Sequence, residues 1–426
     1  MYKLIIAQCT TIFIFARAFE NANYIEKDRC DGLEEFRCQI NCNINPDDNL
    51  DVPQIIKRHG YPSEAHVVET DDGYLLKLHR IPGSQSGKRG DQPVFLQHGL
   101  LGSSADWILN GNNSLGFFLA DQGYDVWLGN SRGNTYSRGH VSLPIWSTQY
   151  WNFSWHEMGT LDLPSALYYV SNTTGKLGDI IYIGHSMGTT EFFVLSSVLP
   201  QIAKNVKLMI ALAPAAYTTH IRSPIRYLAP FVSDLEWLAM HLGINELLPN
   251  NKIFRFLAYE CEKHNSKKIC ENLLFVLCGF NRDEFNIEII PTVVSHDPAG
   301  TSTKTALHYA QEVKNEGKFQ QYDYGPAGNM IQYGTPTPPQ YKLENIKRPI
   351  FLMYAENDIL ASAIDVQRLS RKLTNLVGMY KVPLDIFGHV DFIFGKDAYN
   401  LVYKPLLKVM RNFTMESETE YSLTVF

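Results

Sequence analysis

Short apolar runs recur along the chain, separated by stretches long enough for helices. They cover residues 94–96, 126–128, 180–183, 208–212 and 350–354. Continuous apolar runs of this length are typical of parallel strands that are buried on both faces. Strands of this kind that alternate with helices predict a doubly wound α/β sheet.

A turn signal and two stretches of helical spacing predict a hairpin and two helices in addition to these strands. Residues 66–70 and 74–78 flank an Asp-Asp-Gly turn, which predicts an antiparallel hairpin at the start of the sheet. Residues 155–170 carry apolar side chains at near-helical spacing, and a second helix is expected to begin at Ser186 and run past Val194.

The strand and helix pattern is interrupted between residues 217 and 341, where apolar residues occur in irregular, aromatic-rich pieces. We interpret residues 217–341 as a cap inserted into an α/β core formed by residues 51–216 and 342–426. Residues 250–278 alternate charged residues with bulky apolar residues. A mobile lid needs this pattern if one of its faces covers an apolar cleft and the other contacts water. An ordinary amphipathic surface helix would show the same pattern.

The beginning of the chain is typical of a secretory protein. Residues 1–18 combine Lys3 with a mostly apolar run and small residues at their end, which predicts a cleaved signal peptide. The run is too short and too polar for a membrane anchor. Residues 19–50 are polar and acidic, and we interpret them as a propeptide or N-terminal extension. The protein is therefore expected in the secretory pathway, either secreted or lysosomal.

Cysteines, sequons and charge agree with this destination. Six of the seven cysteines remain once Cys9 is removed, their spacing gives no zinc pattern, and an oxidising compartment would suit them. The net charge of -6 argues against a nucleic-acid partner, because phosphate recognition needs a basic surplus. Asn152 lies inside a motif that is expected to be buried, which puts its glycosylation in doubt. The predicted glycosylation sites are Asn112, Asn152, Asn172 and Asn412.

The sharpest chemical signal is the sequence Gly-His-Ser-Met-Gly at residues 184–188, between a predicted strand and a predicted helix. This is the context of a nucleophile elbow, whose turn is so tight that Gly184 and Gly188 must flank the serine. Ser186 is therefore the predicted nucleophile, with His185 inside the elbow. The alternative is a glycine-rich turn with an incidental serine.

A serine hydroxyl needs a histidine base and a carboxylate that orients the base, in the order Ser, acid, His for this fold. Asp358 follows the strand at 350–354, where catalytic groups of open α/β sheets gather. Another strand is predicted at 380–384, and His389 lies in the loop after it. Asp358 and His389 are therefore the predicted acid and base. The rival acids are Glu356, Asp365 and Asp391.

An oxyanion hole needs two backbone amides directed at the substrate carbonyl oxygen. One is expected from Met187, the residue after the nucleophile. The other is expected from the glycine-containing loop after the strand at 94–96, and Leu100 is our choice among its neighbouring amides.

Several motifs in one order resemble the animal acid lipase family, which includes gastric, lingual and lysosomal lipases and insect relatives. The resemblance covers the chain from Ile55 to about Leu407. The motifs are GYP at 60–62, TDDGY at 70–74, LQHGLL at 96–101, GNSRGNTYS at 129–137, FSWHEM at 153–158, GHSMG at 184–188, SH at 295–296, PAGTS at 298–302, ND at 357–358 and HVDF at 389–392.

The resemblance implies an α/β-hydrolase fold with Ser186, Asp358 and His389 as its triad and Leu100 and Met187 as oxyanion amides. It implies no metal or cofactor, and a lid with a Cys261–Cys270 disulfide and Cys278 as a free thiol. It also implies that the substrate is a triacylglycerol or sterol ester at a lipid surface. Three further cysteines, of which one could pair with Cys278, have no counterpart in mammalian members: Cys30, Cys38 and Cys42.

Three functions remain open from the sequence. A lipid ester hydrolase is favoured, because a long cap with a lid suits a water-insoluble substrate. A soluble carboxylesterase would share the triad without activation at an interface. An inactive lipid-binding or storage protein would be free to lose Ser186, Asp358 or His389, and all three are present.

Overall fold

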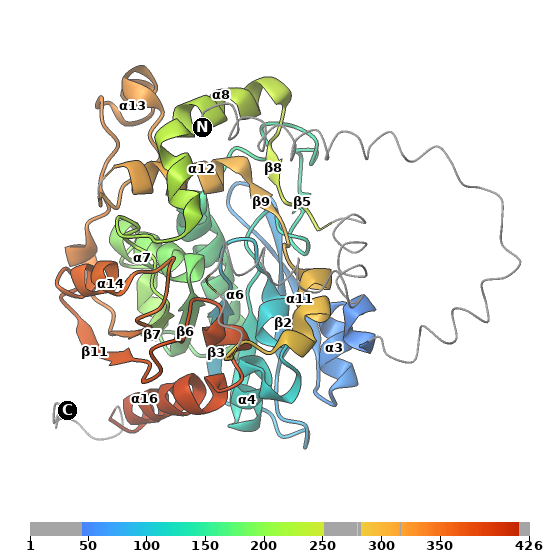
Figure 1. Cartoon of the computed structure of the whole chain (residues 1–426). Helices are drawn as coiled ribbons and strands as arrows, with labels where there is room; N and C mark the ends of the chain where they lie inside the picture. The colour runs from blue at the N-terminus through green and yellow to red at the C-terminus, as the bar shows by residue number, and fades with distance from the viewer. Residues whose placement is uncertain (1–44, 251–278, 280–282, 316, 417–426) are drawn as a thin grey trace, which may run out of the picture. The chain divides into compact units, whose positions relative to one another are not determined.

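The computed structural model describes residues 45–250, 279, 283–315 and 317–416. Its central sheet is mostly parallel (Figure 1). Strand β2 runs antiparallel to β1, β4 and β5, and the other pairings are parallel. In sheet order the strands are β1 (Glu64–Glu69), β2 (Tyr74–Ile81), β4 (Tyr124–Leu128), β3 (Gln92–Gln97), β6 (Ile180–His185), β7 (Val206–Leu212), β10 (Ile350–Tyr354) and β11 (Leu376–Lys381), and β5 (Gly139–His140) pairs with β2.

Helices cover both faces of this sheet, which confirms the predicted fold class. The helices before β7 are α3 (Val52–Arg58), α4 (Leu115–Asp121), α5 (Trp155–Glu157), the π-helix η5 (Met158–Asp162), α6 (Leu163–Thr174) and α7 (Met187–Val198). Those after β10 are α14 (Ala363–Ser370), α15 (Asp391–Phe394), the π-helix η10 (Tyr399–Tyr403) and α16 (Lys404–Glu416). Short 3-10 turns are η2 (Pro46–Asn49), η3 (Ser104–Trp107), η4 (Gly111–Asn113), η6 (Ala203–Asn205) and η9 (Leu343–Asn345).

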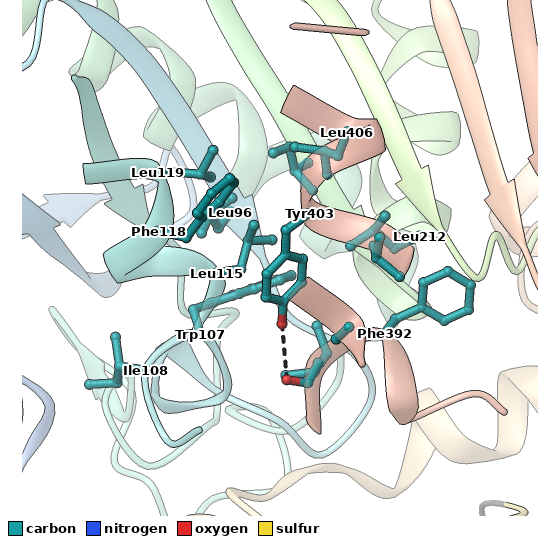
Figure 2. Packing of buried hydrophobic residues seen from close by; sticks show 14 of the residues in the cluster. Leu96, Trp107, Ile108, Leu115, Phe118, Leu119, Leu212, Phe392, Tyr403 and Leu406 are labelled. Carbon is teal, nitrogen blue, oxygen red and sulfur yellow. Dashed lines mark hydrogen bonds between the residues drawn. The ribbon is translucent and has the colours of Figure 1, made fainter. Parts of the chain in front are cut away.

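The core consists of two layers, because successive side chains of a buried strand point to opposite faces. Leu96 of β3 packs with residues of α4 and α16, whereas its neighbour Phe95 packs with residues of α6 and α7. Figure 2 shows the first layer, where the Tyr403 hydroxyl donates to the Ile393 carbonyl at 3.1 Å. With both faces covered, the sheet is a rigid support for the loops at its edge.

The predicted strands and helices are observed, with one strand misplaced. The helix expected at 155–170 is α5 to α6, with a π-helical turn inside it. The strand expected at 380–384 is wrong, since β11 ends at Lys381. Pro383 has no amide hydrogen for a ladder. The true strand lies at the sheet edge and reads Leu-Val-Gly-Met-Tyr-Lys, in which Gly378 interrupts the apolar residues.

The chain between β7 and β10 leaves the sheet, where the sequence predicted an inserted cap. Its described elements are η7 (Pro224–Phe231), α8 (Val232–Leu242), β8 (Glu246–Leu247), η8 (Ile287–Ile289), α11 (Ile290–His296), β9 (Thr301–Ser302), α12 (Thr303–Lys314) and α13 (Gly325–Tyr333). Strands β8 and β9 form a separate antiparallel pair. The domain boundaries stay a prediction.

Some predicted segments lie outside the described residues. These are the signal peptide, nearly all of the N-terminal extension, the lid after Asn250, and the cysteine pair Cys261 and Cys270. Among the residues that are described, no helix is long and apolar enough to cross a membrane.

Candidate active site

The turn from β6 into α7 holds Ser186 in a backbone conformation that L-residues rarely adopt, with φ 52° and ψ -116°. A side chain at either flanking glycine would clash with neighbouring backbone. A Cβ on Gly184 would lie 2.7 Å from the backbone of Gly188. A Cβ on Gly188 would lie 2.4 Å from the carbonyl oxygen of Gln97 at the end of β3. The observed turn therefore has the geometry of a nucleophile elbow.

We expect Gly188→Ala to destabilise the folded state by about 2–3 kcal/mol, because the added methyl group meets rigid backbone and overpacks the elbow. Urea unfolding measures the loss. Gly175→Ala is the control, since that site has φ 70° but open space at its Cβ, and it should cost only about 1 kcal/mol. Equal losses in the two variants would mean that the contact with β3 can relax.

Three side chains from separate loops form one hydrogen-bond chain beside the elbow. Ser186 Oγ lies 2.8 Å from His389 Nε2, and His389 Nδ1 lies 2.8 Å from Asp358 Oδ2. Asp358 is fully buried after β10, and its Oδ1 accepts from the amides of Leu360 and Ala361 at 2.8 and 2.7 Å. Those two amides fix the carboxylate, so the other oxygen faces the imidazole.

The rival carboxylates have other partners. Asp365 accepts from the backbone amide and Nδ1 of His220 at 2.7 and 2.8 Å. Glu356 is exposed and pairs with Lys381. Asp391 accepts from the Gly388 amide at 2.7 Å, and burial raises the pKa of this carboxyl to about 7. Of the four candidate acids, only Asp358 has a hydrogen bond to the His389 ring among the described residues.

The loop after β3 lies against the elbow, where the second oxyanion amide was expected. A Cβ on Gly99 would lie 3.2 Å from Ser186 Cβ. Within the described part of the chain, the amides of Leu100 and Met187 have no hydrogen-bond acceptor. Met187 begins α7, so its amide belongs to the free N-terminal turn of that helix. Both amides are thus available to a substrate oxygen near Ser186.

Comparison with known proteins places the chain in a family. Family models described as "Partial alpha/beta-hydrolase lipase region" and "alpha/beta hydrolase fold" match residues 52–111 and 92–239. Gastric triacylglycerol lipase of Bos taurus is 41% identical over 372 residues, covering 86% of this chain and 92% of the relative. Lysosomal acid lipase/cholesteryl ester hydrolase of Homo sapiens is 40% identical over 376 residues, covering 87% and 93%. The chain belongs to the acid lipase family. The predicted family and fold are therefore confirmed, as is the assignment to the lipases among the ester hydrolases.

Two histidines of this acid lipase family member support the site: His185, which was predicted as part of the elbow, and His98, which the sequence did not single out. His185 Nε2–H donates to the backbone oxygen of His389 at 2.9 Å, which connects the elbow to the loop of the predicted base. His98 Nδ1–H donates to the carbonyl of Gly99 at 2.8 Å, while its Nε2 accepts from the Ser131 amide. Burial lowers the pKa of His185 to about 3 and that of His98 to about 4, so both stay neutral above those values. In the sequence, these two histidines could be found only through the motifs around residues 98, 131 and 185, which lie far apart along the chain and come together in the fold.

The four sequons of this acid lipase family member are open to solvent at their asparagines. The motif around Asn152 is buried at Trp151 and Phe153, as expected, whereas the Asn152 side chain between them is exposed and accepts from Lys304 Nζ at 3.0 Å. A tight turn centred on Asn152, in which the Phe153 amide donates to the Trp151 carbonyl at 2.9 Å, directs Asn152 outward while its neighbours fill the core. Glycosylation remains a prediction at the exposed residues Asn112, Asn152, Asn172 and Asn412.

Proposed function

We propose that this protein hydrolyses lipid esters, with Ser186 as nucleophile, His389 as general base and Asp358 as the carboxylate that orients the base. The observation that carries the proposal is the hydrogen-bond chain of 2.8 Å from Ser186 Oγ to His389 and 2.8 Å from His389 to Asp358. This arrangement gives the weakly nucleophilic hydroxyl an acceptor for its proton at the moment of attack.

The reaction follows from these positions. Ser186 Oγ attacks the ester carbonyl as its proton moves to His389 Nε2, and the negative charge of Asp358 stabilises the imidazolium that forms. The amides of Leu100 and Met187 would stabilise the oxyanion of the tetrahedral intermediate. His389 then protonates the leaving alcohol, which leaves an acyl group on Ser186. Water, activated by the same histidine, attacks the acyl-enzyme and releases the acid.

We further propose a triacylglycerol or sterol ester as substrate, presented at a lipid surface. The printed names of the relatives, triacylglycerol lipase and cholesteryl ester hydrolase, support these two ester classes. The interface is supported by η7 and α8, which expose large apolar side chains where a soluble protein would bury them. Tyr227, Trp237 and Met240 are 70%, 57% and 66% exposed. Figure 1 shows α8 at the end of the molecule away from α4 and α16.

Activity on one short-chain ester, measured through its solubility limit, tests this function. A lipase that works at a surface shows a sharp rise once droplets form, and emulsified triacylglycerol or sterol ester is then cleaved. Smooth saturation below the limit would indicate a soluble carboxylesterase instead. No turnover on any ester, with intact folding, would indicate an inactive lipid-binding protein.

We expect Trp237→Ser to lower the rate on droplets about tenfold, because one large apolar contact with the surface is lost, and to leave the rate on dissolved ester unchanged. Initial rates on both forms of one ester measure this difference. Tyr168→Ser is the control, since Tyr168 is 62% exposed on α6, outside η7 and α8. Equal loss on dissolved and emulsified ester would contradict a role at the surface.

The secretory pathway remains the proposed location. Relatives are named lysosomal acid lipase and gastric lipase, and the four sequon asparagines are exposed. Expression in a secreting cell, with and without glycosidase treatment, would show whether the chain is exported and carries glycans.

A further inference from the structure

Two carboxyl groups that the proposed mechanism does not use contact each other beside the oxyanion loop, residues 99–103. Asp106 lies in η3, and Asp297 follows α11 in the insertion between β7 and β10. Their side chains are within hydrogen-bond contact. No backbone, amide or alcohol group among the described residues donates to the buried Oδ1 of Asp297. Two ionised carboxylates in this position would repel each other, so one of them must carry a proton.

The carboxyl pair lies against the backbone of the oxyanion loop. Asp106 Oδ1 accepts from the Ser103 amide at 3.2 Å. A Cβ on Gly102 would lie 2.2 Å from Asp106 Oδ2, so the carboxyl fills the space beside that residue. A change in the position of Asp106 therefore has to move the loop that carries the Leu100 amide.

The partner carboxyl belongs to a segment that holds the same loop from the other side. The Ala299 amide, two residues after Asp297, donates to the Leu101 carbonyl at 2.6 Å. The Ala299 carbonyl in turn accepts from the Thr135 amide at 2.8 Å. Leu101 has φ 65°, a conformation that persists only where the surroundings hold it. The oxyanion loop is thus clamped by one backbone bond and one carboxyl contact.

We infer that Asp106 and Asp297 share one proton and act as positioning residues, which hold the oxyanion loop in its working geometry until that proton is lost at rising pH. While the proton is present, one carboxyl donates to the other across the clamp. When the proton leaves to solvent, two adjacent negative charges separate the segments, and the Leu100 amide moves away from the oxyanion position. The predicted effect on hydrolysis rests on the proposed function, whereas the effect on stability does not.

Within the described part of the chain, no cation forms an ion pair with either carboxyl. Burial raises the pKa of both carboxyls, and the charge of Asp106 raises that of Asp297 further. His98, directly before the loop, and His79, which contacts Ser104 of η3, are buried and have lowered pKa values, so they stay neutral near pH 7. The other titratable and charged groups among the described residues of the flanking elements are His296 at the end of α11, Asp48, which accepts from Thr292 of α11, and the ion pair of Arg138 with Glu246 near Gly300.

The shared proton also makes folding depend on pH. An unfolded aspartate has a pKa of about 3.9, and both folded values are raised. The folded state therefore binds the proton more tightly than the unfolded chain. The stability that the pair contributes is fully present below the unfolded pKa and is lost as pH rises through the raised pKa of the pair.

The test is the double variant Asp106→Asn with Asp297→Asn, in the full chain. Two amides can donate to each other and do not titrate. For each protein, kcat/KM on a dissolved ester is measured at pH 8 and divided by its value at acid pH. We expect this fraction to be about tenfold larger in the variant than in the native chain. We also expect the melting temperature of the variant minus that of the native chain to be larger at pH 7 than at pH 4 by at least about 2 °C. Each single variant should show the same trends, since one amide can donate to the remaining carboxylate.

Glu236→Gln is the matched control, because burial also raises the pKa of that carboxyl while its partner is the Tyr322 hydroxyl. It should keep the native pH profile of kcat/KM. An unchanged pH profile together with an unchanged melting difference in the Asn variants would overturn the shared proton. If the native chain hydrolyses no ester but the melting difference grows with pH, the pair stands and the proposed function fails.

Discussion

Ser186→Ala should abolish ester hydrolysis, lowering kcat by about 10⁶-fold, which is the scale on which a serine triad loses activity without its nucleophile. The change deletes the oxygen that lies 2.8 Å from His389 Nε2. That imidazole is the hydroxyl's only hydrogen-bond partner among the described residues. Alanine can take up the same backbone strain at φ 52°, so the melting temperature should stay within about 2 °C of the native value.

Labelling with a serine-directed phosphonate provides an independent measurement. The native chain should take up one equivalent, at Ser186, and the Ser186→Ala chain should take up none. Ser86→Ala is the control, since Ser86 is exposed and its hydroxyl contacts only Ser84 among the described residues. Near-native turnover by Ser186→Ala, or labelling at another serine, would assign the nucleophile elsewhere.

The features that the sequence predicted well are those determined by residues close together in the chain. Strands such as β3 and β6 are buried on both faces, so their inner positions, 94–96 and 180–183, form continuous apolar runs that can be recognised directly. The elbow was predictable for the same reason, because the space around Ser186 restricts Gly184 and Gly188 within one turn. The edge strand β11 was misplaced because Gly378, a residue that is rare in strands, interrupts its apolar residues.

Features that join distant segments could not be predicted from one sequence. The contact of Asp106 with Asp297, and the bond from His185 to the His389 carbonyl, depend on how two loops meet in space. The outward direction of Asn152 depends on the packing of its neighbours. Residue type and spacing do not encode such contacts. The motifs nevertheless indicated which loops gather at the sheet edge, because parallel strands end there together.

Asp358 and Asp365 allow a paired test of the proposed acid of the triad. Asp358→Asn should lower kcat by about 10⁴-fold and change KM little. The new side chain would accept from the Leu360 and Ala361 amides through its oxygen, as Asp358 Oδ1 does. Its NH₂ group would then face His389 Nδ1, which would have to accept. The ring proton would move to Nε2, and that atom could no longer take the proton of Ser186.

Asp365→Asn is the matched control, because Asp365 is equally buried, lies seven positions further along, and binds His220 instead of the base. Its kcat should fall by less than about threefold, although its loss of stability should be comparable. Phosphonate labelling of Ser186 should be slowed by Asp358→Asn and not by Asp365→Asn, because labelling depends on the same activation of the hydroxyl. A reversed pattern, with slow labelling in Asp365→Asn alone, would transfer the role of the acid to Asp365.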